Sequence, residues 1–198
     1  IGDDAAVIDV GEGGILITGD VLCEGIHFRR EHIPLDDLGW KSLAVNLSDI
    51  AAMGGVPRFF ILLIALPPSM TVEEVDTFLS GLQQAARLYD VSLVGGDVVG
   101  TTGQLYISIA VIGKPSSRSS ILREGAQQGD GVFLTGEIGG AACGLEVLLK
   151  GDELLRERFS DLVALHRRPV PRLQAGVELA KREIPTAMID LSDGLAQD

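Results

Sequence analysis

Cysteine is scarce in this sequence. Among 198 residues only Cys23 and Cys143 are cysteines, and they lie far apart in the chain. Neither a zinc-binding cluster nor a disulfide framework fits this number and spacing, and we interpret both as small buried side chains. The fold must therefore depend on a hydrophobic core, and a hydrophobic content of 46% is sufficient for one.

Positive charge is also in short supply. Lys and Arg together number 16 against 28 Asp and Glu, which gives a net charge of -12. This argues against a nucleic-acid-binding protein, because phosphate backbones are bound by clustered positive charge. An acidic protein that handles phosphates must recruit cations, so the surplus of aspartate fits the use of divalent metals. It fits an ordinary solvated surface equally well.

Long apolar runs are missing. The longest, residues 59–66, ends at Pro67 and is too short to cross a bilayer. No signal peptide is visible, so we expect a cytoplasmic protein with no membrane partner. The sequence begins and stops beside motifs. We therefore expect a fragment of a longer protein that lacks a short N-terminal piece and a larger C-terminal one.

Strand and helix patterns interleave along the chain, which is typical of a mixed α and β class. Strands are predicted over residues 5–10, 15–18, 59–66, 92–94, 105–112, 132–135 and 187–191. Helices are predicted before Gly54 (capped by Asp36 or Asp37), after a Thr71–Glu74 capping box, beyond the glycine-rich residues 136–144, and over residues 153–166 and 172–183. Residues 113–120 are the best candidate for a boundary between a domain of residues 1–114 and a domain of residues 115–198.

Residues 41–57 form the most informative stretch. Ser42, Asn46 and Asp49 are spaced four and three residues apart on an otherwise apolar helix, so they share one face. A carboxylate in such a setting is costly unless it is hydrogen-bonded, paired or bound to a metal. On this stretch alone, a satisfied polar stripe and a metal-binding face are equally good interpretations.

Other aspartates recur at the predicted strand ends, several of them beside glycines. They are Asp3, Asp4, Asp20, Asp97, Asp190 and Asp193. Mg²⁺ is usually held by a few carboxylates together with substrate phosphates, and phosphoryl transfer needs such ions. Each Asp-Gly pair taken singly is better explained as a turn. Their recurrence indicates metal-assisted phosphate chemistry.

Several well-known motifs are missing. The sequence contains no dinucleotide fingerprint, no Walker A loop, no HRD kinase loop and no serine-hydrolase elbow. Three single residues stay open between a structural and a functional role. His27 is a loop histidine or a partner of Asp20, Arg123 is solvated or binds phosphate, and Tyr89 belongs to the core or stacks on a base.

Five motifs occur in one order along the chain. They are GDDAAV at 2–7, the strand ending in Asp20 followed by GIHF at 25–28, LAVNLSDIAAMGG at 43–55, GGD at 95–97, and IDLSDGL at 189–195. Together they resemble the thiamine-monophosphate kinase family of the aminoimidazole-ribonucleotide-synthetase-like superfamily. The resemblance covers essentially the whole chain.

That resemblance implies direct, in-line transfer of a phosphoryl group from ATP to thiamine monophosphate, with several Mg²⁺ ions. The metal ligands would be Asp4, Thr18, Asp20, Asp49, Asp97, Asp190 and Asp193, of which Asp49, Asp20 and Asp193 would serve catalysis and Asp3 would support the site. ATP would contact Tyr89, Gly96, Asp97, Arg123 and Ser192, and the substrate would contact His27.

The implied fold has an N-terminal mixed-sheet α/β domain that dimerises with its twin into a barrel. A truncated C-terminal α+β domain follows, and ATP lies between the two. Two positions depart from the family pattern: Gly19 replaces a Thr or Ser, and Val98 replaces a Thr. Because the residues around the thiamine ring would lie beyond Asp198, we expect this chain by itself to turn over slowly or not at all.

Two other hypotheses remain. One is a different ATP-using enzyme of the superfamily, such as a selenophosphate synthetase or a purine-pathway ligase. A selenophosphate synthetase would carry a reactive cysteine or selenocysteine near its N-terminus, which this sequence does not show. The other is a non-enzymatic, metal-binding dimerisation domain.

Overall fold

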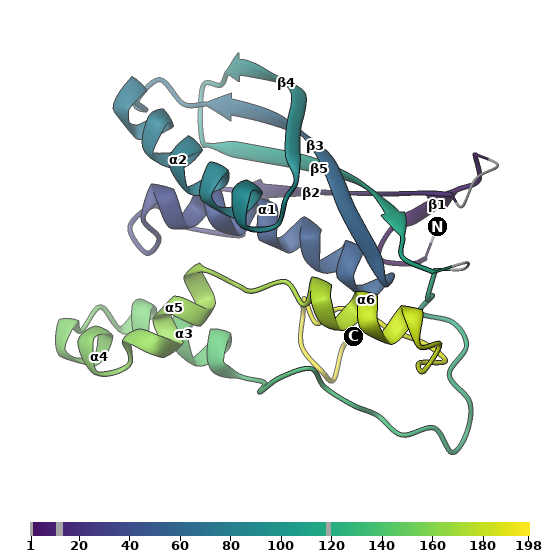
Figure 1. Cartoon of the computed structure of the whole chain (residues 1–198). Coiled ribbons are helices and arrows are strands. Elements are labelled where there is room, and N and C mark those ends of the chain that lie inside the picture. The colour runs from purple at the N-terminus through teal and green to yellow at the C-terminus, as the bar shows by residue number, and fades with distance from the viewer. Residues whose placement is uncertain (1, 11–13, 118–119) are drawn as a thin grey trace.

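The computed structural model describes residues 2–10, 14–117 and 120–198 of the chain (Figure 1). Its strands are β1 (Ala6–Ile8), β2 (Ile15–Cys23), β3 (Gly55–Leu66), β4 (Ser92–Gly100) and β5 (Tyr106–Pro115). Its helices are α1 (Leu35–Ala52), α2 (Val72–Leu88), α3 (Gly140–Lys150), α4 (Glu153–Arg158), α5 (Ser160–Arg167) and α6 (Leu173–Lys181). The chain is therefore a mixed α and β protein, as predicted.

The described strands form one sheet in the order β1-β2-β5-β3-β4. Only β3 and β4 run parallel, and the other neighbours are antiparallel. The parallel pair is connected through α2, because parallel neighbours need a crossover. The sheet stays open within one chain, so β1 and β4 are its two edges.

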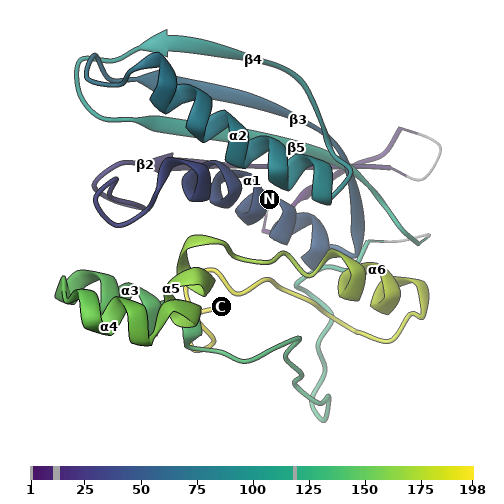
Figure 2. The ribbon, with the colours of Figure 1, turned by 60° about the vertical axis from the view of Figure 1, so that its left-hand side comes forward.

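One face of the sheet is covered and the other is not. In β3, Phe60, Leu62 and Ile64 are buried, whereas Phe59 and Leu63 are nearly half exposed. The predicted strand over residues 59–66 is confirmed, but it alternates instead of being buried throughout, because α1 and α2 lie on a single side of the sheet (Figure 2).

Helix α2 begins as the sequence predicts. The backbone N–H of Thr71 donates to the Glu74 carboxylate over 2.8 Å, and the Glu74 N–H donates to the Thr71 hydroxyl over 3.3 Å. This reciprocal pair is the capping box.

Helix α1 begins differently from the prediction. Its N-cap is Pro34 and no side chain caps the first turn, so the predicted cap by Asp36 or Asp37 is wrong. Both aspartates lie inside the first turn and their carboxylates bind Arg168 instead. They thus link α1 to the end of α5, far along the chain.

Glycines allow α1 and α2 to approach closely. A Cβ atom on Gly39 would overlap the carbonyl oxygen of Phe78, and one on Gly81 would overlap the carbonyl oxygen of Asp36. The close contact fixes the position of α1 over the sheet, and with it the position of the polar stripe that α1 carries.

The C-terminal helices lie on the side of α1 that faces away from the sheet (Figures 1 and 2). Helix α6 packs on the end of α1, where a Cβ on Gly176 would overlap the carbonyl oxygen of Ala51. The strands predicted over residues 132–135 and 187–191 are wrong, because neither segment has a strand partner among the described residues. Val132 and Phe133 are 87% and 89% exposed.

The division of the chain at residue 114 stays a prediction, and residues 118 and 119 of the predicted boundary lie outside the described residues. None of the helices in the described ranges combines the length and the apolar character that a membrane crossing requires.

Candidate metal centre

Three carboxylates from distant parts of the chain meet beside α1. Asp4 comes from the loop before β1, Asp49 from α1 and Asp190 from the segment after α6. One oxygen of each lies within 4.8 Å of the others. All three were predicted as metal ligands, and the fold brings them together. We call this group the aspartate trio.

The polar stripe on α1 connects the helix to the sheet. Asn46 donates through Nδ2 to the Ser42 carbonyl over 3.0 Å, and its Oδ1 accepts from the Asp20 backbone N–H over 2.9 Å. The Ser42 hydroxyl donates to the Leu38 carbonyl over 2.7 Å. Asn46 and Ser42 are thus the satisfied polar stripe of the first interpretation, and Asp49 is left for the trio.

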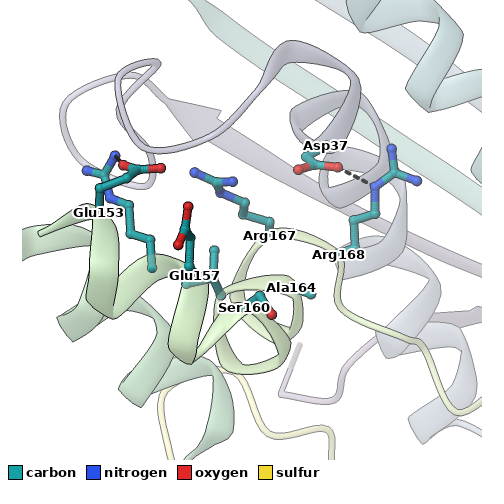
Figure 3. A pocket seen from close by; sticks show the side chains of 9 residues that line it. Asp37, Glu153, Glu157, Ser160, Ala164, Arg167 and Arg168 are labelled. Atoms are coloured by element: carbon teal, nitrogen blue, oxygen red, sulfur yellow. Dashed lines mark hydrogen bonds and ion pairs between the residues drawn. The ribbon is translucent and has the colours of Figure 1, made fainter. Parts of the chain in front are cut away.

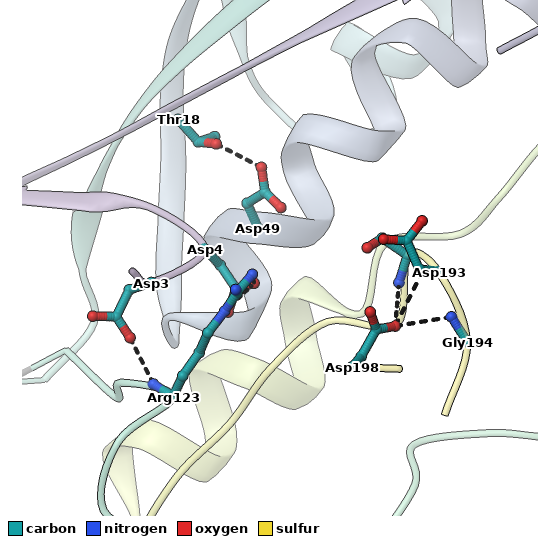
Figure 4. A network of polar contacts seen from close by, with 9 residues as sticks. Asp3, Asp4, Thr18, Asp49, Arg123, Asp193, Gly194 and Asp198 are labelled. Carbon is teal, nitrogen blue, oxygen red and sulfur yellow. Dashed lines mark hydrogen bonds and ion pairs between the residues drawn. The ribbon is translucent and has the colours of Figure 1, made fainter. Parts of the chain in front are cut away.

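Strand β2 presents two predicted ligands toward α1. The Thr18 hydroxyl donates to Asp49 Oδ2 over 2.5 Å (Figure 4). Asp20 lies two residues farther on, which places it on the same face of the strand. The predicted end of this strand at Thr18 is wrong, because β2 continues to Cys23 by pairing with β5. Asp20 therefore lies within the strand, where it pairs with Ile109.

The side chain of Asp4 is fully buried against Arg123. Asp4 Oδ1 accepts from Arg123 Nε over 3.1 Å and from Nη2 over 2.5 Å. The Arg123 backbone N–H donates to Asp3 Oδ1 over 2.6 Å. Asp4 Oδ2 is buried and has no hydrogen-bond partner in the described part of the chain. An orphaned buried carboxylate oxygen is costly, and a bound cation would satisfy it.

The trio is electrostatically crowded. Burial raises the pKa of Asp49 to about 7; the Thr18 hydrogen bond opposes this shift, and the charges of Asp20, Asp190 and Asp4 add to it. Burial likewise raises the pKa of Asp190 to about 6. Burial also raises the pKa of Asp20, with the nearby His27 acting in the opposite direction. A divalent cation would relieve this crowding, and a donor set made only of oxygens suits Mg²⁺.

His27 lies in the turn after β2, next to the predicted site. Its Nδ1 accepts from the backbone N–H of Cys23 over 3.0 Å, which leaves Nε2 free to face solvent or a ligand. The ring is exposed, and it is close enough to Asp20 to influence its pKa.

Asp97 is not brought to the trio within one chain. It lies in β4, and β5 and β3 separate β4 from β2, which is about 14 Å at the usual strand spacing. Its carboxylate accepts from the Val98 N–H over 2.9 Å. The neighbouring Gly96 is required by packing, since a Cβ there would overlap the Leu62 carbonyl oxygen.

Tyr89 is half-buried, packs against the outside of the core and is not part of the trio. Its ring meets Trp40 edge-on at 5.8 Å, with 62° between the planes. Burial raises its pKa, and Arg172 acts against that shift.

Ser192 and Asp193 lie in an exposed turn near the end of the chain. The Asp198 carboxylate accepts from the backbone N–H groups of Ser192, Asp193 and Gly194 over 3.0, 3.1 and 3.0 Å (Figure 4). Asp193 follows Asp190 by three residues but is not itself part of the trio.

Sequence reasoning missed one contact of the site. Ser48 hydrogen-bonds the Asp190 carboxylate and lowers its pKa against the effect of burial. Its position beside Asp49 was visible, but no pattern indicates that residues so far apart in sequence are partners. The metal, ATP and substrate roles of all these residues remain predictions.

Comparison with known proteins shows what this chain is similar to. Residues 2–114 match the family described as AIR synthase related protein, N-terminal domain. The thiamine-monophosphate kinase of Bacillus subtilis is 38% identical over 203 residues, which cover 100% of this chain and 62% of that protein. The Escherichia coli K12 enzyme of the same name is 38% identical over 202 residues and is covered to 60%.

Solved structures show the same similarity. The structure of AaThiL complexed with AMPPCP and TMP superposes with a TM-score of 0.93 at 34% identity, covering 100% of this chain and 62% of that one. The thiamine-monophosphate kinase of Stenotrophomonas maltophilia K279a superposes with a TM-score of 0.84 at 34% identity, covering 100% and 63%. The chain thus spans about three fifths of the length of these relatives. Matched over 2–114, it belongs to the AIR synthase related protein family.

Proposed function

We propose that the whole protein transfers a phosphoryl group from ATP to thiamine monophosphate, giving thiamine diphosphate and ADP. The observation that carries this proposal is the convergence of Asp4, Asp49 and Asp190 within 4.8 Å. The names of the relatives support the substrate, and the AaThiL complex holds an ATP analogue together with TMP. We propose the cytoplasm as the compartment.

The residues present fit Mg²⁺. The trio, with Thr18 and Asp20 behind it, would hold the ion, and Asp4 Oδ2 is a buried oxygen that lacks any other partner in the described ranges. When bound, Mg²⁺ neutralises negative charge on the phosphoryl group being transferred. The protein itself then has to position donor and acceptor, and no covalent phosphoenzyme is needed.

Arg123 and His27 are the groups best placed to orient phosphates. The Arg123 side chain binds Asp4 and is still 41% exposed, so its remaining N–H groups can face a nucleotide phosphate. His27 is exposed beside Asp20 and would contact the acceptor. The turn at Ser192 and Asp193 would border the site on the side where the nucleotide binds.

We also propose a homodimer formed through the uncovered face of the sheet. This face carries exposed apolar residues, among them Val21 (51%), Phe59 (47%), Leu63 (45%) and Tyr106 (40%). An apolar face of this kind is typical of an interaction surface. Asp97 pairs in register with Leu63, so it lies on the same face. A second copy packed on this face would therefore cover Asp97 as well.

The deciding experiment is phosphorus NMR on the complete protein with Mg²⁺, ATP and thiamine monophosphate. We expect diphosphate resonances of thiamine diphosphate to appear together with ADP. ATP left intact in the presence of folded protein would overturn the proposal. Turnover with selenide, but not with thiamine monophosphate, would assign the protein to another reaction of its superfamily.

A further inference from the structure

A cavity of about 350 Å³ lies between the start of α1 and the helices α4 and α5 (Figure 3). Its charged lining residues are Asp37, Glu153, Arg156, Glu157, Arg167 and Arg168. Asp37 and Asp49 are about 18 Å apart along α1 at the usual rise per residue. The cavity is therefore separate from the metal centre, and its function is independent of the one proposed above.

Arg168 is fully engaged in holding the helices together. Its guanidinium binds the carboxylates of Asp36 and Asp37 and donates to the side chain of Gln84. It also lies over the Trp40 ring, 5.4 Å from the centroid. These contacts explain the position of the Arg168 side chain without any ligand.

Arg167 is not satisfied in the same way. Its Nε donates to the His32 carbonyl over 2.7 Å, which aims the rest of the guanidinium along the cavity. Figure 3 shows it between Glu157 and Asp37. No carboxylate of the described residues lies within ion-pair distance of it. Burial lowers its pKa. The charge of Asp37 raises it again, the charge of Arg156 lowers it, and Asp36 and Glu153 have smaller raising effects.

Arg156 is the second poorly satisfied cation. It makes one long hydrogen bond to the Leu148 carbonyl, 3.4 Å, and one long ion pair with Glu153, 3.5 Å. Its Nε is buried and lacks a partner within the described ranges. Two guanidinium groups close enough to repel each other, both with unused donors, form a site for an anion.

An unused acceptor lies beside Arg156 on α4. The Glu157 side chain lines the cavity and forms no ion pair or hydrogen bond with any residue that the structure describes. Ser160, the first residue of α5, adds a hydroxyl to the lining. A ligand that fits these groups carries an anionic group and, close to it, a hydrogen-bond donor or positive charge.

We propose that this cavity binds a small phosphate monoester that also carries an amine. Arg156 and Arg167 hold the phosphate, because planar guanidinium groups match its oxygens in pairs. Glu157 holds the amine. The volume lies within the range of small-molecule sites. The phosphate supplies more acceptor oxygens than a carboxylate for the donors of two arginines and Ser160.

The test is calorimetric titration of O-phosphoethanolamine into the protein without Mg²⁺. We expect a dissociation constant of about 1 mM or tighter. Inorganic phosphate should bind more weakly, and ethanolamine should not bind. In the NMR spectrum, the amide signals that shift should belong to α4 and α5. No heat together with no shift at saturating concentration overturns the proposal, as do shifts confined to the neighbourhood of Asp4 and Asp49.

Variants separate binding from folding. Arg167→Gln should weaken binding at least about tenfold, and Glu157→Gln should reduce the affinity for O-phosphoethanolamine to that for inorganic phosphate. Arg182→Gln is the matched control, because Arg182 is 68% exposed at the end of α6 and pairs with Glu178. Equal binding by Arg167→Gln and the control contradicts the proposal. If Arg167→Gln does not fold, the affinity of Glu157→Gln and the NMR shifts of the unmodified protein still test whether the cavity binds the ligand.

Discussion

At the scale of single residues, Asp49 is the central residue of the candidate metal site. It accepts a hydrogen bond from Thr18 and lies against two further carboxylates, and burial raises its pKa to about 7. Six aspartates were expected as metal ligands, and the fold brings three of them into one cluster. The sequence indicated the residue type and the neighbourhood of glycines. It did not indicate distances, because those depend on how strands and helices are packed.

Asp49→Asn should abolish phosphoryl transfer while the protein stays folded, because the amide removes a negative ligand without changing the size of the side chain. The thermal stabilisation that Mg²⁺ confers on the unmodified protein should also disappear. The measurements are ATP turnover and melting temperature with and without Mg²⁺. Asp76→Asn, on the exposed face of α2, is the control. Full activity in Asp49→Asn would remove Asp49 from the site.

Thr18→Val should raise the pKa of Asp49 further, because the Thr18 hydroxyl stabilises the charged carboxylate by donating to it. Thr18→Ser keeps the donor and should leave the pKa close to its original value. An NMR titration of the Asp49 carboxyl carbon in metal-free protein measures both. Identical titrations in the two variants would show that the hydrogen bond has no such role.

At the scale of elements, the sequence predicts structure correctly where the interacting residues lie close together in the chain. The capping box at Thr71 and Glu74 lies within one helix turn and is confirmed. The apolar residues 132–135 and 187–191 resemble strands equally well, yet they form none. A strand exists only when a neighbour accepts its hydrogen bonds, and the sequence pattern does not identify that neighbour.

Gly81→Ala tests the contact between α1 and α2. The new Cβ would overlap the Asp36 carbonyl oxygen, so the helices must move apart. We expect a loss of about 3 kcal/mol in the free energy of unfolding. Chemical denaturation measures it. Gly103→Ala is the control, because no atom lies within 4 Å of its Cβ position. Equal stability of both variants would refute the close approach.

His166, near the end of α5, should make the stability of the fold depend on pH. Burial, and then the charge of Lys41, lowers its pKa to about 4. In the unfolded chain His166 takes up a proton near pH 6.5, whereas in the folded chain it does so only near pH 4. The free energy of unfolding is therefore at its full value above pH 6.5 and decreases as the pH falls toward 4. Relative to the unmodified protein, His166→Gln should gain about 1 kcal/mol of stability at pH 4.5. Denaturation at pH 7.5 and 4.5 measures the difference, and equal pH dependence of the two proteins would contradict it.

At the scale of the whole molecule, the open sheet is the main unsatisfied feature. Its helices cover one face, and Phe59, Leu63 and Tyr106 remain exposed on the other. The dimer implied by resemblance would cover this face, and the barrel it would form stays a proposal.

Leu63→Asp should convert the proposed dimer into a monomer, because two buried carboxylates would face each other across the interface. Sedimentation velocity measures the mass. Leu154→Asp, at a 76% exposed position of α4, should leave the assembly unchanged. A monomeric unmodified protein, or a dimeric Leu63→Asp variant, would exclude this interface.

The sequence by itself determined the class of the fold, the polar stripe of α1 and the chemical nature of the candidate site. These properties depend on residue types and on periods of two and 3.6 residues, which a linear chain displays directly. Only the tertiary structure decided which acids meet, that Arg123 covers Asp4, and that Asp97 stays at the far edge of the sheet. Those facts depend on strand order and helix packing, because residues from the two ends of the chain become neighbours only when the sheet and α1 are assembled.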